Sequence, residues 1–534
     1  MELVMKKIVF LLCAMFFAWA CYEDKGNYDY REINQITIQG IDTLIRCDQM
    51  DLLSIPVTLE GTQYADTNRF SYLWEVNREA VATTKDLNIY ANFPLGENTG
   101  RFIVTDKDLG TKAFWNFRIN VASSTAGDGI LVLSKYHGHA ELSFKRLDKE
   151  GSVFTPNYYE AIAGHQLGNE PRKIHRNYRP ESDNNNSSLL IETDYFLKSF
   201  DAETLLETGE NKYLDAYFFM SSAMEWQPGV TDFKVQTCLH LPAKMMMFDV
   251  GYVYIIANDA LWACQTVNMA PMGGGYTRAS NLPAKKSPRD GALSPVVFMP
   301  EWTENSKRDL AYVFDETYGH FLKAPSSGNL VDCPDLGEYS GYKLVYGTHT
   351  SAANYSVAVL SNGTQYKMLY LKLSSPQSVV GEVEVPAGVM NETTSYYPVR
   401  TEPYLFFATA DKLYRYNLRE LENGIVPGSK DVVLDLANFK DEKGVGYEGD
   451  VQITCMTVSR TEQEIVLGVS RYGGDEEAMS DELKGDVLVL KLDDRSLIRK
   501  YSGIAGRPVD VMIKYQKYLW GGREGGKVVD ELYW

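Results

Sequence analysis

Short runs in which apolar and polar residues alternate dominate the chain from residue 34 onward. Between residues 34 and 122 they include FSYLWEVN, GRFIVTD and AFWNFRINVA, with turn residues between them. Alternation with a period of two is typical of strands that bury one face, and no sustained helical period interrupts it. The pattern predicts a small antiparallel β-sandwich over residues 34–122, in which Trp74 points inward from a central strand.

A second rhythm begins beyond the small, polar segment 123–128, which we interpret as a domain boundary. There an apolar run, a polar turn and a second apolar run recur as a unit. Seven copies occupy residues 130–147, 189–205, 252–267, 310–324, 356–373, 404–418 and 464–497. Such repeats are typical of propeller blades, which must close into a ring to bury their faces. We therefore predict a β-propeller of about seven blades over residues 129–534; an irregular pair of β-sandwiches is the alternative.

Two strand-like runs follow the last copy, VDVMIKY (509–515) and KVVDELYW (527–534). Either run is suited to completing the first or the last blade, because propellers commonly close by pairing distant strands. The whole chain is thus predicted to be all-β.

The first twenty residues have the layout of a secretory signal peptide. Lys6 and Lys7 precede an apolar run over residues 8–17, which is too short to span a bilayer as a helix. Cys21 directly after a small residue resembles a lipoprotein signal, although Ala18 stands where such signals more often have Leu. The resemblance implies that Cys21 is acylated and becomes the mature N-terminus, with residues 21–33 as a tether. The alternative is an ordinary cleaved signal followed by a chance cysteine.

Composition and charge narrow the classes of function. The chain is 44% apolar and 23% charged, as in folded globular proteins. Its formal charge of −18 disfavours nucleic acid and anionic lipid headgroups as partners, because phosphate binding needs clustered Lys and Arg. Five cysteines remain in the fold without a CxxC pair, and we expect buried free thiols. They are Cys47, Cys238, Cys264, Cys333 and Cys455.

The runs CYEDKGNYDY, YLWEVN and GRFIVTD, the last followed by FRINVAS, resemble the PKD-like lipoproteins of Bacteroidota. The resemblance covers about residues 15–125 and implies a PKD/immunoglobulin-like sandwich. It also implies a surface lipoprotein beside a starch-utilisation-type system, in which a TonB-dependent channel works with a lid lipoprotein. Glu23 and Asp24 resemble the family's signal for the outer face of the outer membrane; a solvated tether is the alternative. The family supplies no catalytic residues.

Motifs of catalysis are scarce. The chain lacks HExxH, the Gly-x-Ser-x-Gly elbow, the P-loop and the EF-hand loop. His137 and His139 could share a metal from one strand face, but a hairpin turn with solvated imidazoles is the interpretation we adopt, and we predict no metal or cofactor. The acidic loop RYGGDEEAMSDELKGD is interpreted as solvated rather than as a Ca²⁺ site. Many Asp and Glu residues could form a glycosidase pair, and the sequence selects none.

Aromatic residues in the segments between the repeats are the candidates for ligand binding. In a propeller such segments converge on the central channel, where flat rings stack on sugars or grip peptide side chains. The alternative is that they cap the blades and close the core. The candidates are Trp226, Tyr276, Trp302, Tyr339, Tyr342, Tyr396 and Tyr397.

One modification site is also predicted. Asp42-Thr43-Leu44 resembles the three-residue sequon at which exported Bacteroidota proteins receive O-glycans, which makes Thr43 the acceptor. Thr43 as an ordinary strand residue is the alternative.

Together these features predict a non-enzymatic lipoprotein anchored in outer-membrane lipid and facing the extracellular side. Its predicted role is that of an accessory binding or docking subunit of a TonB-dependent importer, with a glycan or peptide as ligand. Two alternatives stay open: a propeller-fold glycoside hydrolase or lyase, and a purely structural subunit of the importer.

Overall fold

The computed structural model describes a large part of the chain, which divides into two compact units, Met1–Ala122 and Ser123–Trp534. Apart from Met5, the predicted signal peptide lies outside the described residues, as do Cys21, Glu23 and Asp24. Within those residues, no helix combines the length and the apolar character needed to cross a bilayer. The described residues are 5, 33–62, 67–177, 188–193, 197–207, 235–241, 244–245, 248–257, 259–267, 285–299, 311–325, 329–473, 481–515, 523–524 and 527–528.

The first unit is the predicted β-sandwich. One layer is a five-stranded sheet in which only the pairing of β2 with β9 is parallel. Its strands in order are β2 (Leu44–Asp48), β9 (Lys112–Ala122), β8 (Gly96–Asp106), β5 (Phe70–Val76) and β6 (Glu79–Ala82). The other strands form antiparallel pairs, β1 (Ile36–Gln39) with β4 (Thr58–Gly61) and β3 (Leu52–Ile55) with β7 (Leu87–Tyr90).

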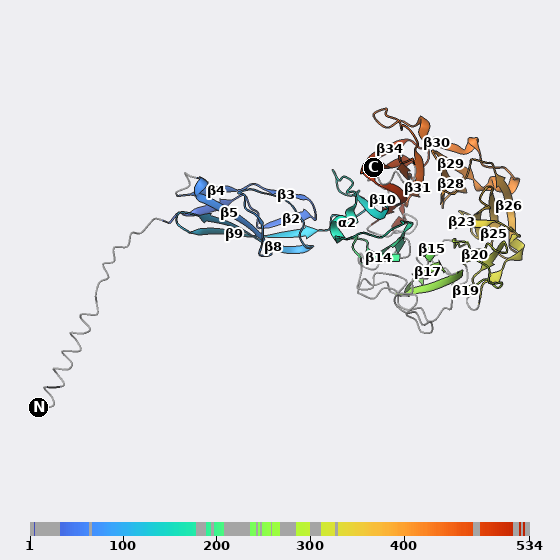
Figure 1. The fold of residues 1–534 in the computed structure, drawn as a ribbon, viewed down its shortest axis with the longest axis horizontal. Helices are drawn as coiled ribbons and strands as arrows, with labels where there is room; N and C mark the ends of the chain where they lie inside the picture. The colour runs from blue at the N-terminus through green and yellow to red at the C-terminus, as the bar shows by residue number, and fades with distance from the viewer. Residues whose placement is uncertain are drawn as a thin grey trace. The chain divides into compact units, whose positions relative to one another are not determined.

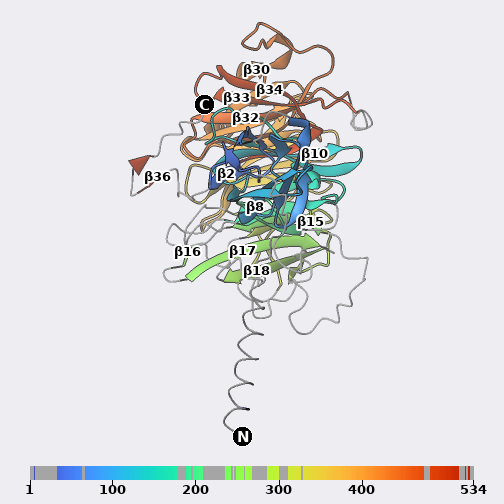
Figure 2. The same cartoon turned by 90° about the vertical axis from the view of Figure 1, so that its left-hand side faces the viewer.

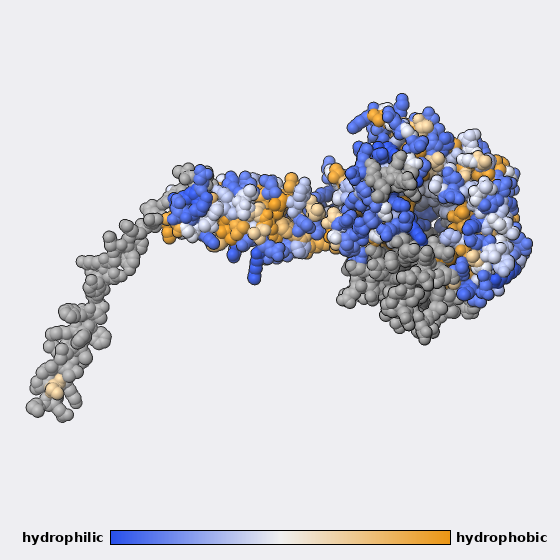
Figure 3. Space-filling model, viewed as in Figure 1, coloured by the Kyte–Doolittle hydropathy of each residue, from blue (hydrophilic) through white to orange (hydrophobic). Residues whose placement is uncertain are grey.

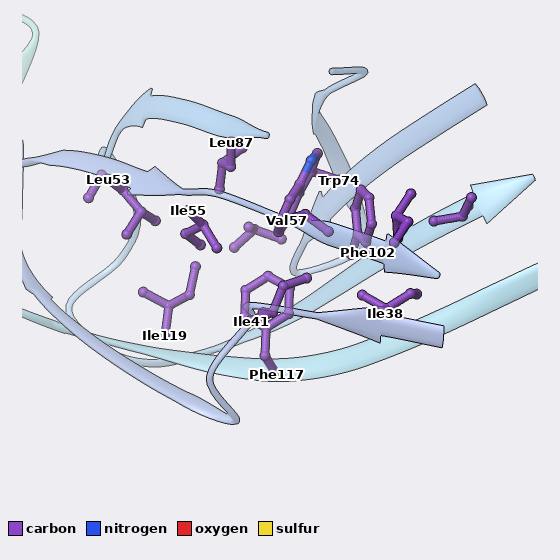
Figure 4. Packing of buried hydrophobic residues seen from close by; sticks show 14 of the residues in the cluster. Ile38, Ile41, Leu53, Ile55, Val57, Trp74, Leu87, Phe102, Phe117 and Ile119 are labelled. Atoms are coloured by element: carbon purple, nitrogen blue, oxygen red, sulfur yellow. The ribbon is translucent and has the colours of Figure 1, made fainter. Parts of the chain in front are cut away.

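Trp74 lies at the centre of the sandwich core, as its strand pattern predicts. Its side chain is 1% exposed, and its ring lies 4.3 Å from that of Phe102 and 5.8 Å from that of Phe117, centroid to centroid (Figure 4). The indole Nε1 donates to the carbonyl oxygen of Thr84 at 2.9 Å, so the polar atom of this large apolar side chain is satisfied.

The second unit is a β-propeller. In its described residues seven sheets of at least three strands follow one another around a ring (Figure 1). Figure 2 shows the ring turned by 90°, with β17 and β18 on one side and β32, β33 and β34 on the other. The prediction of an all-β chain with a propeller of about seven blades is confirmed.

The blades are numbered here along the chain. Blade 1 contains β10 (Gly129–Tyr136), β11 (His139–Arg146) and β35 (Arg507–Lys514); blade 2 contains β12 (Lys173–Asn177), β13 (Ser188–Glu192) and β14 (Leu197–Asp201). Blade 3 contains β15 (Val235–Leu241), β16 (Lys244–Met245), β17 (Phe248–Ala257), β18 (Ala260–Val267) and β19 (Lys285–Lys286); blade 4 contains β20 (Tyr312–Asp315), β21 (His320–Lys323) and β22 (Val331–Asp332). Blade 5 contains β23 (Lys343–His349), β24 (Tyr355–Ser361), β25 (Tyr366–Lys372) and β26 (Ser378–Val385).

Blade 6 contains β27 (Ser395–Pro398), β28 (Tyr404–Thr409), β29 (Lys412–Asn417) and β30 (Val432–Asp435); blade 7 contains β31 (Gln452–Val458), β32 (Glu464–Ser470), β33 (Gly485–Lys491) and β34 (Leu497–Ala505). Within the described part of residues 33–528, helical structure comprises α2 (Tyr158–Ala163) and the 3₁₀ helices η1 (Thr67–Arg69), η2 (Pro334–Leu336), η3 (Leu418–Asn423), η4 (Ser429–Asp431) and η5 (Leu436–Asn438).

Each predicted repeat corresponds to one hairpin of the ring. In blades 3 to 7 these hairpins are the two middle strands of the blade. In blades 4 to 7, where the structure describes the side chains, most of these residues are buried, which explains why the hairpins read as apolar runs. The seven pairs are β10–β11, β13–β14, β17–β18, β20–β21, β24–β25, β28–β29 and β32–β33. In blade 4, residues 293–298 bridge to β20 at both ends and take the place of an inner strand.

The ring closes by pairing of distant strands. β35, which contains most of the run VDVMIKY, lies antiparallel to β10 and completes blade 1, with Val132 opposite Val511. Lys514 at its end donates through Nζ to the carbonyl oxygens of Thr125 (2.5 Å) and Ala202 (2.7 Å). Of the run 527–534, residues 527–528 form β37, which pairs with β36 (Arg523–Glu524), and the rest lies outside the described residues.

Two of the predicted free thiols are placed by the structure. Cys333 and Cys455 are buried and form no disulfide. Burial raises the pKa of Cys333 to about 12 and also raises that of Cys455, so both are neutral thiols at physiological pH. Cys47 is half-buried, and Cys238 and Cys264 lie on β15 and β18.

Candidate functional site

The inner strands of the ring differ from the middle strands in exposure. β24, β28 and β32 are buried almost throughout, whereas β23, β27, β31 and β35 keep partly exposed side chains. An inner strand pairs on one side only, so its other edge faces the ring axis, where Figure 3 shows a hollow in the surface. We call these partly exposed residues the channel wall: Tyr346, Thr348, Tyr396, Tyr397, Gln452, Thr454, Arg507 and Asp510.

Tyrosines form one part of the channel wall. The rings of Tyr346 on β23 and Tyr396 on β27 are stacked, with centroids 4.4 Å apart and planes at 15°. The hydroxyl of Tyr396 donates to Sδ of Met390 at 3.8 Å. Burial raises the pKa of both tyrosines, which keeps them neutral. Tyr346 and Tyr396 also pack against the core between blades 5 and 6, and Tyr397, the next residue on β27, packs on the opposite face between blades 6 and 7. All three side chains are therefore only partly exposed.

Polar groups form the other part. Arg507 on β35 donates through Nη2 to Oε1 of Gln452 on β31 at 2.9 Å, which links blades 1 and 7 across the closure. Asp510, also on β35, accepts a 2.8 Å hydrogen bond at Oδ2 from the backbone N–H of Ile174 on β12. Burial raises the pKa of Asp510, and the charge of Lys173 opposes that rise.

Asp510 is the single carboxylate on the inner strands of the described part of the ring. Those strands are β12, β15, residues 293–298, β23, β27, β31 and β35. The channel wall therefore offers tyrosine, amide, hydroxyl and guanidinium groups around one carboxylate. Such a set suits hydrogen bonding and ring stacking with a polar ligand.

The sequence candidates fall into two separate groups. Tyr396 and Tyr397 belong to the channel wall, whereas Tyr339 and Tyr342 lie beside the outer strands of blade 5. Tyr339 is buried and donates to Oε2 of Glu382 at 3.2 Å, and Tyr342 donates to Oε1 of Gln365 at 3.3 Å. Trp226, Tyr276 and Trp302 lie outside the described residues.

A lysine joins Tyr339 and Tyr342 into one cluster. Nζ of Lys367 lies 5.8 Å from the ring centroid of Tyr339 and 5.7 Å from that of Tyr342. It also donates to Oε1 of Glu382 at 2.6 Å, and this bond raises the pKa of Lys367. Lys367, Glu382 and both tyrosine hydroxyls already have partners. We therefore interpret this cluster as one that stabilises the blade and not as a ligand-binding site.

The tight histidine pair forms the turn between β10 and β11. His137 has a left-handed backbone (φ 47°), and its Nε2 lies 3.3 Å from Oδ1 of Asp481. His139 bonds through Nδ1 to Oδ1 of Asn169 at 2.8 Å, so the two side chains have different partners. The two histidines do lie at a hairpin turn, as the sequence predicts. No group of three potential metal-ligating residues occurs in the described part of the chain.

Two other candidates are placed as follows. Thr43 is exposed, just before β2, and its carbonyl accepts a 3.0 Å hydrogen bond from the N–H of Arg118. Residues 474–480 of the acidic loop lie outside the described residues.

Sequence reasoning missed Tyr346, Gln452, Arg507 and Asp510. All four lie on inner strands, which precede or follow the recognised hairpins and are less apolar. An available signal was the alternating run just before a hairpin, such as KLVYGTH before SVAVL or QITCMTV before EIVLGV.

The sheets define a β-sandwich followed by a seven-bladed propeller. Comparison with protein families gives a match for the N-terminal part of the chain. Residues 21–171 match the model of the PKD-like family, so the match includes the sandwich, β10, β11 and α2. No curated protein matches the chain.

Solved structures with a similar fold share little sequence with this chain. A quinonprotein alcohol dehydrogenase-like protein from Bacteroides thetaiotaomicron has 12% identity and a TM-score of 0.46, covering 88% of this chain and 96% of its own. A functionally unknown protein from Desulfotomaculum acetoxidans has 12% identity and a TM-score of 0.38, with coverage of 73% and 99%. The WD40 domain of SCAP from fission yeast has 10% identity and a TM-score of 0.34, with coverage of 70% and 87%.

Proposed function

We propose that this chain is a lipid-anchored protein of the outer membrane whose propeller binds a glycan or peptide for a TonB-dependent uptake system. The observation that carries the proposal is the position of the family match. It begins at Cys21, the residue at which the signal sequence is expected to be cleaved and acylated. The acidic pair Glu23 and Asp24 directly follows and supports display on the outer face.

The anchor explains how binding alone would serve uptake. Two or more acyl chains, each contributing about 0.8 kcal/mol per buried methylene, hold a protein stably on a bilayer. A binder tethered beside a channel raises the local concentration of its ligand without chemistry. The sandwich would then act as a spacer and the propeller as the recognition body.

The channel wall is the proposed binding surface. Tyrosine rings suit sugar faces or apolar peptide side chains, and Gln452 and Arg507 supply an amide and a guanidinium for hydrogen bonds. Hydrolysis of a glycoside needs two carboxylates about 5–10 Å apart. The inner strands of the described residues supply Asp510 alone, which favours binding over the hydrolase alternative.

Two experiments test the proposal. Wild-type chain expressed in a Bacteroidota host should incorporate labelled palmitate and be cleaved by protease added to whole cells, whereas the Cys21→Ser variant should not incorporate palmitate. Purified protein should then be retarded in affinity electrophoresis by members of a glycan or peptide panel. Lack of labelling would refute the anchor, and product release from the panel would favour the hydrolase or lyase.

A variant locates the binding surface. Arg507→Ala should weaken binding about ten-fold or more, equivalent to about 1.4 kcal/mol for a lost hydrogen bond to a charged group. Arg499→Ala, at an exposed position of β34, should leave it unchanged. Equal effects of the two substitutions would place the ligand away from the channel wall. Absence of any ligand, with co-purification of a channel protein, would favour the structural-subunit alternative.

A further inference from the structure

Three buried polar side chains on the hairpin β10–β11 each carry an oxygen atom that has no hydrogen-bond partner within the described residues. Ser134 and Ser143 are 0% exposed and Glu141 is 8% exposed. Both serine Oγ atoms and Oε2 of Glu141 are buried without a partner. Buried polar atoms in folded proteins nearly always have a partner, either protein or ordered water.

The three side chains share one face of the hairpin. Ser134 stands directly opposite Glu141, and Ser143 stands opposite Val132, two positions along. Since side chains two residues apart point to the same face, all three lie on the face that carries Val132. Val132 packs with Val487 and Val489 of blade 7, so this face forms the seam between the last and first blades.

Blade 7 presents mainly small or apolar groups to this seam. Val466, Gly468 and Ser470 share the facing side of β32 with the buried Glu464, which lies at the opposite end of the strand from Ser470. Ile504 and Ala505 of β34 join the cluster that contains Val466. Ser470 already accepts through Oγ from the N–H of Tyr472 at 3.2 Å. Sγ of Cys455 and Cβ of Pro508 fill the space beside Gly468, and the three unpartnered oxygens of blade 1 face the same seam.

Among the described residues, no basic side chain forms an ion pair with Glu141. On its own hairpin, Lys145 donates to the carbonyl of Ser152 at 2.5 Å and lies over the ring of Tyr501 from β34. Tyr136 donates to the backbone of Asp481 from blade 7. Glu160 on α2 adds a like charge. Burial, followed by that like charge, raises the pKa of Glu141 to about 8, so its neutral form is favoured at physiological pH.

We infer that the seam between blades 7 and 1 holds buried water, bound by Oγ of Ser134, Oε2 of Glu141 and Oγ of Ser143. Water fits because each molecule both donates and accepts, and buried waters typically make about three hydrogen bonds to otherwise unsatisfied groups. A cation fits less well, because hard cations of the Ca²⁺ type take about six to eight oxygens and usually several carboxylates. The inference goes beyond the proposed function and does not depend on which ligand the propeller binds.

A crystal structure of the mature chain at high resolution tests the inference directly. The electron density should show water peaks about 2.7–3.2 Å from Oγ of Ser134, Oε2 of Glu141 and Oγ of Ser143. Direct hydrogen bonds among the three side chains would overturn it, as would an empty seam. A peak with six or more oxygens at about 2.3–2.6 Å would identify a cation instead, and would overturn it too.

Thermal unfolding of variants supplies a second readout. Glu141→Gln keeps hydrogen-bonding groups and should unfold at the same temperature as wild type or higher at pH 7, whereas loss of a cation ligand would lower that temperature. Chelator, or exchange of Na⁺ for K⁺, should not shift the wild-type midpoint; a shift that Glu141→Gln abolishes would overturn the inference. Glu150→Gln, at an exposed position after the same hairpin, is the matched control.

Discussion

Glu141 should make the stability of the propeller fall as pH rises. Its pKa is 4.5 in the unfolded chain and about 8 in the folded one, because burial disfavours the carboxylate. Folding therefore binds a proton at pH values between these two. By linkage, wild-type stability declines as pH rises above 4.5 and stops declining above about 8.

The magnitude follows from the two pKa values. At about 1.36 kcal/mol per pKa unit, the wild type loses about 4 kcal/mol between pH 5 and pH 9 through this one group. Glu141→Gln cannot ionise and should not lose it. For a unit of about 400 residues, with an unfolding entropy of about 2.1 cal/mol/K per residue, the difference amounts to about 5 °C in the unfolding midpoint.

Urea unfolding of wild type, Glu141→Gln and the exposed control Glu150→Gln at pH 5, 7 and 9 measures the effect. The free energy of unfolding of Glu141→Gln should rise relative to that of wild type as pH increases. The free energy of unfolding of the control should change with pH in the same way as that of wild type. Parallel curves for wild type and Glu141→Gln would refute the reasoning, because they would mean that Glu141 is exposed to bulk solvent or paired with a basic group in the folded state.

Three further changes test other parts of the fold. Lys514→Met removes the ammonium that donates to two backbone carbonyls, and should cost about 2–4 kcal/mol in urea unfolding of the propeller. Burial lowers the pKa of His349 from 6.5 to about 4, so wild type should lose up to about 3 kcal/mol as pH falls through that window, and His349→Gln should not. Trp74→Ala should cost the sandwich about 3–5 kcal/mol in its own unfolding transition, without moving that of the propeller. Changes below about 0.5 kcal/mol would contradict each expectation.

The sequence revealed the propeller through the strands that are buried on both faces. The hairpins β24–β25 and β32–β33 read as apolar runs because neighbouring blades cover both of their sides. Inner strands face the axis along one edge and mix apolar with polar residues. The strands β23 and β31 therefore lack the continuous apolar run by which the hairpins were recognised in the sequence. The outer strands β19 and β22 span two residues each and gave no signal.

The residues of the candidate site were harder to predict from the sequence for a related reason. Composition identified aromatic residues between repeats, but their convergence depends on the three-dimensional course of each segment. Tyr396 lies beside the axis and Tyr339 beside an outer strand, although both follow an outer strand in the chain. Likewise, Glu141 occupies an ordinary alternating position in HAELSF, and its lack of a partner emerges only from strand register and packing.

The family match and the physical units divide the chain at different places. The match ends at residue 171, whereas the compact unit ends at Ala122. Residues 129–146 form two strands of blade 1, and the inner edge of β10 is covered by β35, which lies more than three hundred residues further along. A fragment that ends at residue 171 lacks both β35 and blade 7, so the inner edge of β10 would be unpaired and the face with Ile130 and Val132 would be exposed. An isolated two-stranded hairpin is marginally stable at best.

A fragment comprising residues 21–171 should therefore contain a folded sandwich and an unfolded C-terminal segment. Limited proteolysis should trim the fragment back to a product that ends near residue 122. The β-sheet signal in the circular dichroism spectrum should be the same before and after trimming, because the removed segment is unfolded. The full chain under the same conditions should keep residues 129–146 protected. Protection of these residues in the fragment would show that the first hairpin folds with the sandwich and not with the ring, and the division at Ala122 would then be wrong.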